Sequence, residues 1–248
     1  MFRQIIPIVV VAAIVAIVSA VARAEFVCDW TSGPEGWYYY LDEPQGLGAP
    51  MTWVAVGGQQ GGYVQAPLAA MTEWESLPGA YYPAYAYGWV RPGESRELNP
   101  VDFTQDGVVS AWFKSDTSVA AIQPFDLKGG RLHLFIGEWN DPDGPGGVDP
   151  GWTFYHSTQP LLITITPTWQ RASLDVSQPS AWTLWADEGL HKPFHELMDT
   201  PQQWGFTILG ASGVPTGTLA VDTLRVVPEP TTLALLAALA ALRPRRRR

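Results

Sequence analysis

The chain has 248 residues, 15 basic and 24 acidic side chains, and a formal net charge of −9. This length fits one large domain or two small ones. The acidic excess argues against proteins that bind nucleic acid or anionic lipid surfaces, because both ligands are polyanions. Cations and neutral glycans fit the charge better.

The first 24 residues predict a secretory signal peptide. Arg3 precedes an apolar run over residues 5–18, and the segment closes on Ala22-Arg23-Ala24, an Ala-x-Ala cleavage site. We therefore expect the mature chain to begin at Glu25. Cys28 is the only cysteine, so no internal disulfide can form, and we expect its thiol to be buried.

The C-terminal segment, residues 227–248, combines Pro228-Glu229-Pro230, an apolar run over residues 231–242 and an arginine-rich end. This combination resembles the PEP-CTERM sorting signal, which exosortase-type membrane proteases recognise in Gram-negative bacteria. The resemblance implies transient anchoring in the inner membrane, removal of the tail, and a final place at the cell surface or in the extracellular matrix. Twelve helical residues span only about 18 Å, less than the roughly 30 Å hydrocarbon core, which suits a temporary anchor. An ordinary C-terminal anchor is the alternative.

Both end segments are basic. Setting aside their seven arginines and one glutamate leaves 8 basic and 23 acidic side chains, a net charge of −15 for residues 25–228. No Ser/Thr/Pro-rich linker or internal repeat divides this region. We therefore expect residues 25–228 to form a single domain.

That region predicts an all-β fold. Segments rich in β-branched and aromatic residues lie between turn formers, and several alternate between apolar and polar positions, as an antiparallel sheet requires. We expect an antiparallel two-sheet β-sandwich, jelly-roll-like, with a single helical turn over residues 193–198. The expected strands are residues 37–41, 51–56, 62–66, 107–114, 131–136, 151–156, 161–167, 169–175, 205–210 and 217–226.

Both ends of this region resemble extracellular jelly-roll modules, namely carbohydrate-binding modules and the laminin B domain. The opening carries Asp29 and then Gly36-Trp37, and the closing pair of strands covers residues 204–210 and 218–226, with Asp222 before the final apolar alternation. The resemblance implies a structural Ca²⁺ held between Asp29 and Asp222. Both carboxylates could instead cap turns.

A second candidate Ca²⁺ site is the acidic loop over residues 140–149. Asp141, Asp143 and Asp149 supply the hard oxygen ligands that Ca²⁺ prefers, and glycines allow sharp turns. Pro142 and Pro145 stiffen the loop, so an acidic turn-rich loop without metal is the alternative.

The aromatic residues suggest that the ligand is a glycan. All twelve tryptophans lie between the two end segments, and Trp and Tyr rings stack on the apolar faces of sugars. The candidate stacking residues are Trp89, Trp139, Trp152, Tyr155 and Trp185. A further aromatic group at residues 74–89 lies in a segment with weak strand periodicity, which we expect to be a loop or an edge. The alternative is that these rings pack beneath loops.

These features together predict an exported, surface-sorted, non-catalytic protein, a carbohydrate-binding or extracellular-matrix module that binds no nucleic acid. One alternative is a glycan-processing enzyme, a hydrolase or lyase on the same scaffold, because acidic residues lie beside tryptophans. A purely structural surface protein is the other alternative. The acids in question are Glu73, Glu75, Glu138, Asp187 and Glu188.

Overall fold

The structure is a computed structural model that describes residues 26–41, 48–74, 78–88, 95–104, 107–115, 127–140, 151–163, 167–188 and 193–227. The predicted signal peptide, the predicted sorting tail with Pro228, Glu229 and Pro230, residues 141–149 of the acidic loop and Trp89 lie outside these ranges. Among the described residues, no helix is both long and apolar enough to cross a bilayer.

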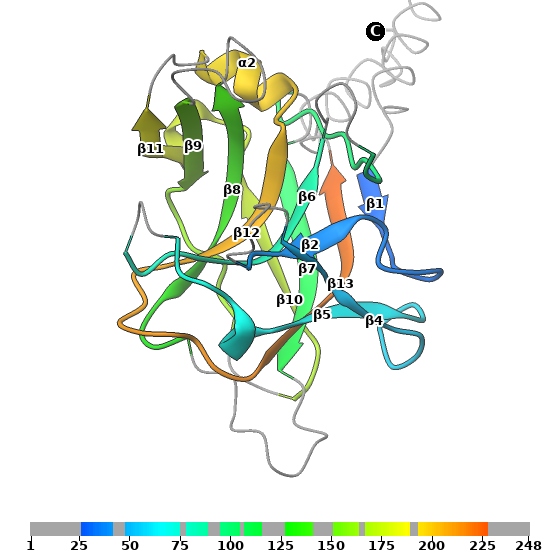
Figure 1. The fold of residues 1–248 in the computed structure, drawn as a ribbon. Helices are drawn as coiled ribbons and strands as arrows, with labels where there is room; N and C mark the ends of the chain where they lie inside the picture. Colours follow the sequence, from blue (N-terminus) through cyan, green and yellow to red (C-terminus); the bar gives the residue numbers. More distant parts are fainter. Residues whose placement is uncertain are drawn as a thin grey trace, which may run out of the picture.

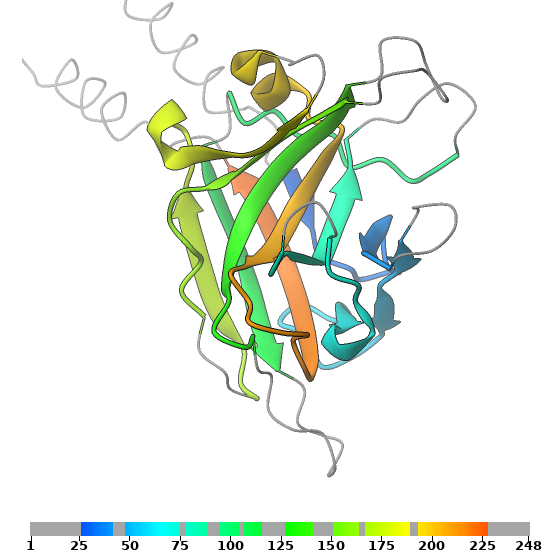
Figure 2. The same ribbon diagram turned by 60° about the vertical axis from the view of Figure 1, so that its left-hand side comes forward.

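Two antiparallel sheets pack face to face, which confirms the predicted sandwich (Figures 1 and 2). The first, sheet A, runs in the order β10 (Gln170–Asp175), β7 (Val108–Ser115), β13 (Thr218–Val227), β5 (Tyr63–Pro67) and β4 (Thr52–Val54), and β1 (Phe26–Cys28) also pairs with β13. The second, sheet B, runs β11 (Trp182–Glu188), β9 (Gly151–Ser157), β8 (Arg131–Asn140), β12 (Gln203–Leu209), β6 (Tyr81–Tyr87), β2 (Trp37–Tyr39) and β3 (Ala49–Pro50).

Helix is scarce in the described part of the chain. The predicted helical turn is confirmed as α2 (Phe194–Asp199), which contacts β8 near one end of sheet B (Figure 1). Leu197 and Met198 of α2 are buried. Two single 3-10 turns, η1 (Leu68–Ala70) and η2 (Pro179–Ala181), complete the helical content of the described ranges.

The main core lies between the sheets and is built by strand alternation. Leu132, Leu134 and Ile136 of β8 are at most 1% exposed and point toward sheet A, as the sequence pattern predicts. Trp204 of β12 packs edge-to-face on Trp37 of β2 with ring centroids 5.3 Å apart. The indole nitrogen of Trp204 donates to a backbone carbonyl at 2.8 Å, so its polar atom is satisfied inside the core.

Cys28 is buried, as predicted, at the end of β1. Its Sγ donates a hydrogen bond to Oε2 of Glu35 at 2.9 Å. Burial, strengthened by the neighbouring carboxylate, raises the pKa of the Cys28 thiol far above its usual range. The thiol is therefore a core group rather than a nucleophile.

Two predictions about strands are wrong. The segment that we expected to be a loop or edge is β6, an interior strand of sheet B whose seven residues are all buried. Because neither face of β6 meets solvent, it lacks the polar alternation that marks most antiparallel strands. Conversely, residues 161–163 form no strand, and Leu162 is 84% exposed. The sequence also did not predict β11 as a strand.

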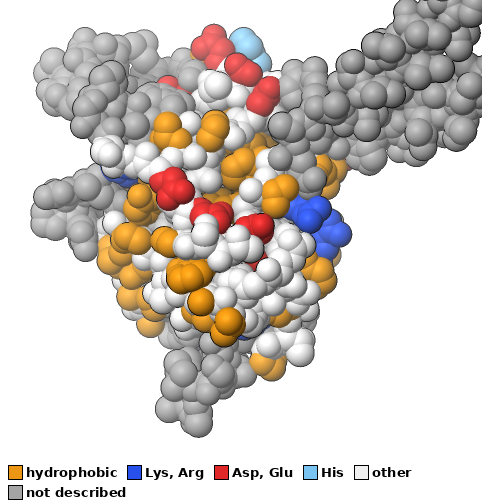
Figure 3. All heavy atoms as spheres, turned by 90° about the vertical axis from the view of Figure 1, so that its right-hand side faces the viewer, with side chains coloured by type: hydrophobic (Ala, Val, Ile, Leu, Met, Phe, Trp, Pro, Cys, Tyr) orange, Lys and Arg blue, Asp and Glu red, His pale blue; other side chains and the backbone are white. Residues whose placement is uncertain are grey.

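The described surface is sparsely and mainly negatively charged. Figure 3 shows the side that carries β1 and β4, where acidic side chains are spread among apolar ones and basic side chains gather at one edge. This pattern agrees with the acidic composition.

Candidate functional site

The outer face of sheet B, which points away from sheet A, carries a second hydrophobic cluster made almost entirely of aromatic rings. We call this cluster the aromatic face. Its buried members are Trp74, Ala80, Tyr82, Tyr85, Tyr87, Phe135 and Phe154, and Tyr38, Tyr40, Trp152, Trp185 and Leu209 pack against them with partial exposure.

An irregularity in β6 brings the tyrosines to this face. Phe206 of β12 pairs with Ala84, but Ile208 pairs with Tyr81, so β6 has one extra residue in this stretch. Tyr81 belongs to the main core, whereas Tyr82 and Tyr85 both belong to the aromatic face although they are three residues apart. Regular alternation would have placed them on opposite faces.

Gly137 of β8 makes room for the rings of the aromatic face. A Cβ atom at Gly137 would overlap the ring of Phe154 on the neighbouring strand β9. Phe154 can therefore lie against the β8 backbone, where it stacks on Phe135 with ring centroids 6.2 Å apart. The glycine is thus required by close packing on this face.

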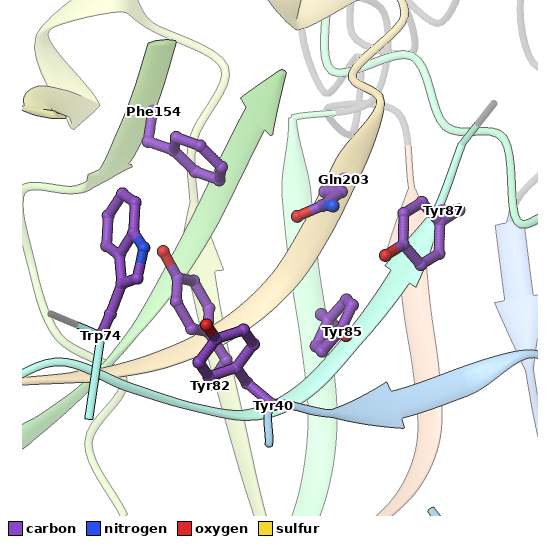
Figure 4. Close-up of a pocket in the computed structure, with 7 residues that line it drawn as sticks. All are labelled: Tyr40, Trp74, Tyr82, Tyr85, Tyr87, Phe154 and Gln203. Carbon is purple, nitrogen blue, oxygen red and sulfur yellow. The ribbon is translucent and has the colours of Figure 1, made fainter. Parts of the chain in front are cut away.

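A small pocket opens among these side chains. Its volume is about 40 Å³, and its lining consists of Tyr40, Trp74, Tyr82, Tyr85, Tyr87, Phe154 and Gln203 (Figure 4). Figure 4 shows the Tyr82 hydroxyl directed between Trp74 and Phe154. This hydroxyl is buried and has no hydrogen-bond partner among the described residues. A buried hydroxyl without a partner costs roughly 1–3 kcal/mol, so a ligand atom that bonds to it would recover that free energy.

The tyrosines of the pocket are neutral phenols. Burial, together with the neighbouring Tyr40 and Tyr85, raises the pKa of Tyr82 well above its usual range. Burial and the hydrogen-bonded Tyr87 likewise raise the pKa of Tyr85, and the nearby positive charge of Arg96 offsets part of this rise. These hydroxyls therefore keep their protons at neutral pH and can donate as well as accept hydrogen bonds.

Two of the predicted stacking residues join the aromatic face. Trp152 lies 6.0 Å from Trp74, and Trp185 lies 5.2 Å from it, measured between ring centroids. Both are only partly buried, so part of each ring is open to solvent. These two tryptophans border the buried tyrosines on the β9 and β11 side of the cluster.

Tyr155 is not brought to this site. It follows Trp152 by three residues in a regular strand, so it points to the opposite face, where it packs against the main core and against Phe194 of α2 at 4.7 Å. The backbone of Trp139 pairs with Trp152 in the β8–β9 ladder, but its side chain lies outside the described part of the structure, as does all of Trp89.

The sequence reasoning did not select the residues that form the pocket itself. Trp74, Tyr82, Tyr85 and Tyr87 belong to the aromatic group that we expected in a loop or at an edge. The spacing of the tyrosines at 82, 85 and 87 would have indicated the site only if the extra residue in β6 had been recognised.

The two Ca²⁺ ligands that the resemblance implies, Asp29 and Asp222, accept hydrogen bonds from other groups of the protein. One oxygen of Asp29 accepts from the backbone N–H and the hydroxyl of Thr31 at 3.1 and 3.0 Å, as in an Asx turn. Asp222 is fully buried and accepts from the Gln59 N–H and the Thr223 hydroxyl. Within the described ranges, no three His, Cys, Asp or Glu side chains group closely enough to hold a metal ion. The Ca²⁺ sites stay predictions, and Asp141, Asp143 and Asp149 lie outside the described residues.

Two of the acids considered for catalysis, Glu73 and Glu138, have side chains in the described part of the structure, and their surroundings differ. Glu73 is exposed and accepts from the Gly79 N–H and the Tyr81 hydroxyl. Glu138 is buried within β8. Glu75 and the side chains of Asp187 and Glu188 lie outside the described part of the structure.

No family model matches the chain, and no curated protein is similar enough to match it. Among solved structures, it is similar to the family 11 carbohydrate-binding module from Clostridium thermocellum in complex with a β-1,3-1,4-mixed-linked tetrasaccharide, at 14% identity and a TM-score of 0.41, over 84% of this chain and 97% of that one. The solution structure of the module CtCBM11 gives 13% identity and a TM-score of 0.46, over 84% and 96% of the two chains. A Trypanosoma rangeli sialidase mutant displaying trans-sialidase activity gives 12% identity and a TM-score of 0.29, over 94% of this chain and 38% of that one. Identities and TM-scores this low give no argument about function. A proposal about function must therefore rest on what the chain's own side chains can bind.

Proposed function

We propose that the protein is a carbohydrate-binding module and that the aromatic face of sheet B is its binding site. The observation that carries this proposal is the Tyr82 hydroxyl, which is buried, has no partner among the described residues and is directed between Trp74 and Phe154 of the pocket lining. Apolar walls around a few convergent polar groups are typical of small-ligand sites. A sugar combines an apolar ring face with polar hydroxyls, so it matches both parts of this lining.

The dimensions of the site determine how a sugar would bind. A pocket of about 40 Å³ holds a few water molecules or one ring substituent, but not a whole pyranose ring. The ring itself would therefore stack on the partly exposed indoles of Trp152 and Trp185, while a substituent reaches Tyr82. Stacking would supply most of the binding free energy, because sugar hydroxyls exchange one set of hydrogen bonds for another.

The test is binding of soluble polysaccharides by the full chain, measured by affinity electrophoresis and calorimetry. Trp152→Ala and Trp185→Ala should each weaken binding by about 2 kcal/mol, close to thirtyfold, as hot-spot aromatics do. The matched control is Trp53→Ala, because Trp53 is 36% exposed on sheet A. Equal loss in all three variants, or none in the first two, would contradict the assignment of the site.

A glycan-processing enzyme is the alternative that the same experiment can separate. A hydrolase or lyase would release new reducing ends or unsaturated products from the polysaccharide that it binds, and its two carboxyl groups would lie about 5–10 Å apart. We propose binding without turnover, so the polymer should keep its length after prolonged incubation. Chain shortening that persists in highly purified protein would favour the enzyme.

We further propose that the protein is exported and sorted to the cell surface or extracellular matrix, with the tail removed by an exosortase-type protease. The sequence of the two end segments supports this proposal. Mass spectrometry of surface material should recover chains that begin near Glu25 and lack residues 231–248. Intact arginine-rich C-terminal peptides in the exported pool would contradict it.

A structural Ca²⁺ is proposed on the sequence resemblance at Asp29 and Asp222 and on composition at the acidic loop. An ion that binds only the folded state raises the melting temperature by linkage. Millimolar Ca²⁺ should therefore raise the midpoint and a chelator should lower it. If neither changes the midpoint, neither site binds Ca²⁺ with useful affinity.

A further inference from the structure

The polar groups of the pocket are rich in hydrogen-bond donors. Figure 4 shows the indole nitrogen of Trp74 on the side of the ring that faces the Tyr82 hydroxyl. An indole N–H can only donate, and a phenol donates more strongly than it accepts. Trp185, which packs against the same cluster, adds a second indole nitrogen that is buried and has no partner in the described part of the chain. None of the described lining residues carries a carboxylate.

A cation contacts the pocket lining at Tyr87, on the opposite side of the pocket from Trp74 (Figure 4). The guanidinium carbon of Arg96 is 4.1 Å from the ring centroid of Tyr87, a cation–π contact with a residue of the pocket lining. The same charge lowers the pKa of Tyr85 against the larger effect of burial, so its field extends to a second lining residue.

We infer that the preferred glycan carries carboxylate groups, as a uronic acid does, and that Arg96 selects for them. This inference rests on the proposed function. A carboxylate is an acceptor-only group with two oxygens, so it satisfies several donors without bringing donors of its own. A neutral sugar can also use this lining, because its phenols and the Gln203 amide accept hydrogen bonds, but a neutral sugar cannot form an ion pair with the guanidinium. Guanidinium and carboxylate form charge-assisted hydrogen bonds, which are the stronger kind.

The acidic surface opposes a polyanion only at long range. At about 0.1 M salt, charges more than roughly 10 Å apart are largely screened, whereas a partly buried contact is screened much less. Arg96 is partly buried. At physiological salt, the donors and the guanidinium near the pocket therefore determine the preference, and the distant acids do not.

The experiment compares two forms of one polymer. The full chain is titrated with polygalacturonate and with the same polymer after its carboxyl groups have been reduced to alcohols, which keeps the linkages and removes the charge. The measured quantity is the ratio of the two affinities at 0.15 M salt, for the unmodified protein, Arg96→Gln and Arg96→Lys. Damage to folding would lower both affinities together and leave their ratio unchanged.

We expect the unmodified protein to prefer the charged polymer by about tenfold or more, the range of one charge-assisted hydrogen bond. Arg96→Gln should abolish this preference, and Arg96→Lys should retain part of it. Equal or stronger binding of the reduced polymer would overturn the inference while leaving carbohydrate binding intact. A preference that survives Arg96→Gln would overturn the role of Arg96. If the protein binds neither polymer but binds a neutral glycan at Trp152 and Trp185, the inference is also overturned. If it binds no glycan at all, the proposed function is overturned as well.

Discussion

Replacing Tyr82 by phenylalanine tests directly whether the pocket is built for a ligand. The substitution removes one oxygen that is buried and has no partner among the described residues. The desolvation cost of such a group is roughly 1–3 kcal/mol, so its removal should raise the free energy of unfolding by about 1 kcal/mol. For a domain of this size, that gain corresponds to about 2–4 °C in the melting temperature. The ring of Tyr82 stays, so its contact with Phe135 at 4.8 Å is kept.

Binding should change in the opposite direction. If a glycan oxygen bonds to the Tyr82 hydroxyl, Tyr82→Phe should weaken binding by about 0.5–1.5 kcal/mol, roughly two- to tenfold. Urea denaturation measures the stability, with an unchanged slope as the sign that only stability has changed. Calorimetry on the same protein measures the affinity. A gain in stability together with a loss of affinity is the signature of a group held ready for a ligand.

Tyr81→Phe is the matched control on the same strand. Its ring belongs to the main core, and its hydroxyl donates to Glu73 at 3.4 Å. Its loss should lower stability by up to about 1 kcal/mol and leave binding unchanged. If Tyr82→Phe instead lowers stability by a similar amount, the hydroxyl has a partner within the protein and the argument for the pocket fails. If affinity does not change, the ligand does not use it.

Three further predictions concern packing, pH and the thiol. Gly137→Ala should destabilise the fold by about 1–3 kcal/mol and weaken glycan binding, because the new methyl displaces the Phe154 ring; unchanged stability in urea would show that the ring can move freely. Burial, with a smaller effect from the neighbouring His156, lowers the pKa of His133 below its ordinary value of 6.5. As the pH falls, the unfolded chain therefore takes up this proton before the folded protein does. The free energy of unfolding should decrease as the pH falls from 6.5 to the lower pKa of the folded state. Denaturation at several pH values should show this fall and its reduction in His133→Asn, whereas the exposed His195→Asn should leave it unaltered. Cys28 should react with a thiol reagent only at the rate of unfolding, and rapid labelling of the native protein would contradict its burial.

The sequence predicted the sandwich where polar and apolar residues alternate along a strand, even in β8, whose residues 132–138 are buried on both faces. In β8, the leucines at 132 and 134 alternate with His133, and the alternation gave both the strand and its core face. It failed in β6, because this strand consists only of Tyr, Ala and Pro, so no charged position marks one face, and an extra residue breaks the period of two. Tyr155 was grouped with Trp152 although three residues separate them, a spacing that puts them on opposite faces of a regular strand.

From the sequence, the aromatic character of the site could be predicted, but most of its residues could not. Aromatic content pointed to stacking, and Trp152 and Trp185 do lie on the aromatic face. The ring that links them is Trp74, which lies far from both in sequence, and its place above β9 depends on how its segment folds back on sheet B. Whether a buried hydroxyl has a partner is likewise a property of three-dimensional neighbours. The Tyr82 hydroxyl could therefore not be recognised from its own residue or its flanks.

An unpartnered polar atom does not by itself mark a binding site. The indole nitrogen of Trp30 is also buried and has no partner among the described residues, yet Trp30 belongs to the main core between the sheets. Tyr82 differs because it lines a pocket and its hydroxyl is directed between two other lining residues, Trp74 and Phe154. The two faces of β8 sharpen the contrast, since an outer face that only needed covering could use leucine and isoleucine, as the inner face of β8 does. Phenols bury a hydroxyl at a cost that aliphatic side chains avoid, and a bound sugar would return that free energy at this face of the sheet.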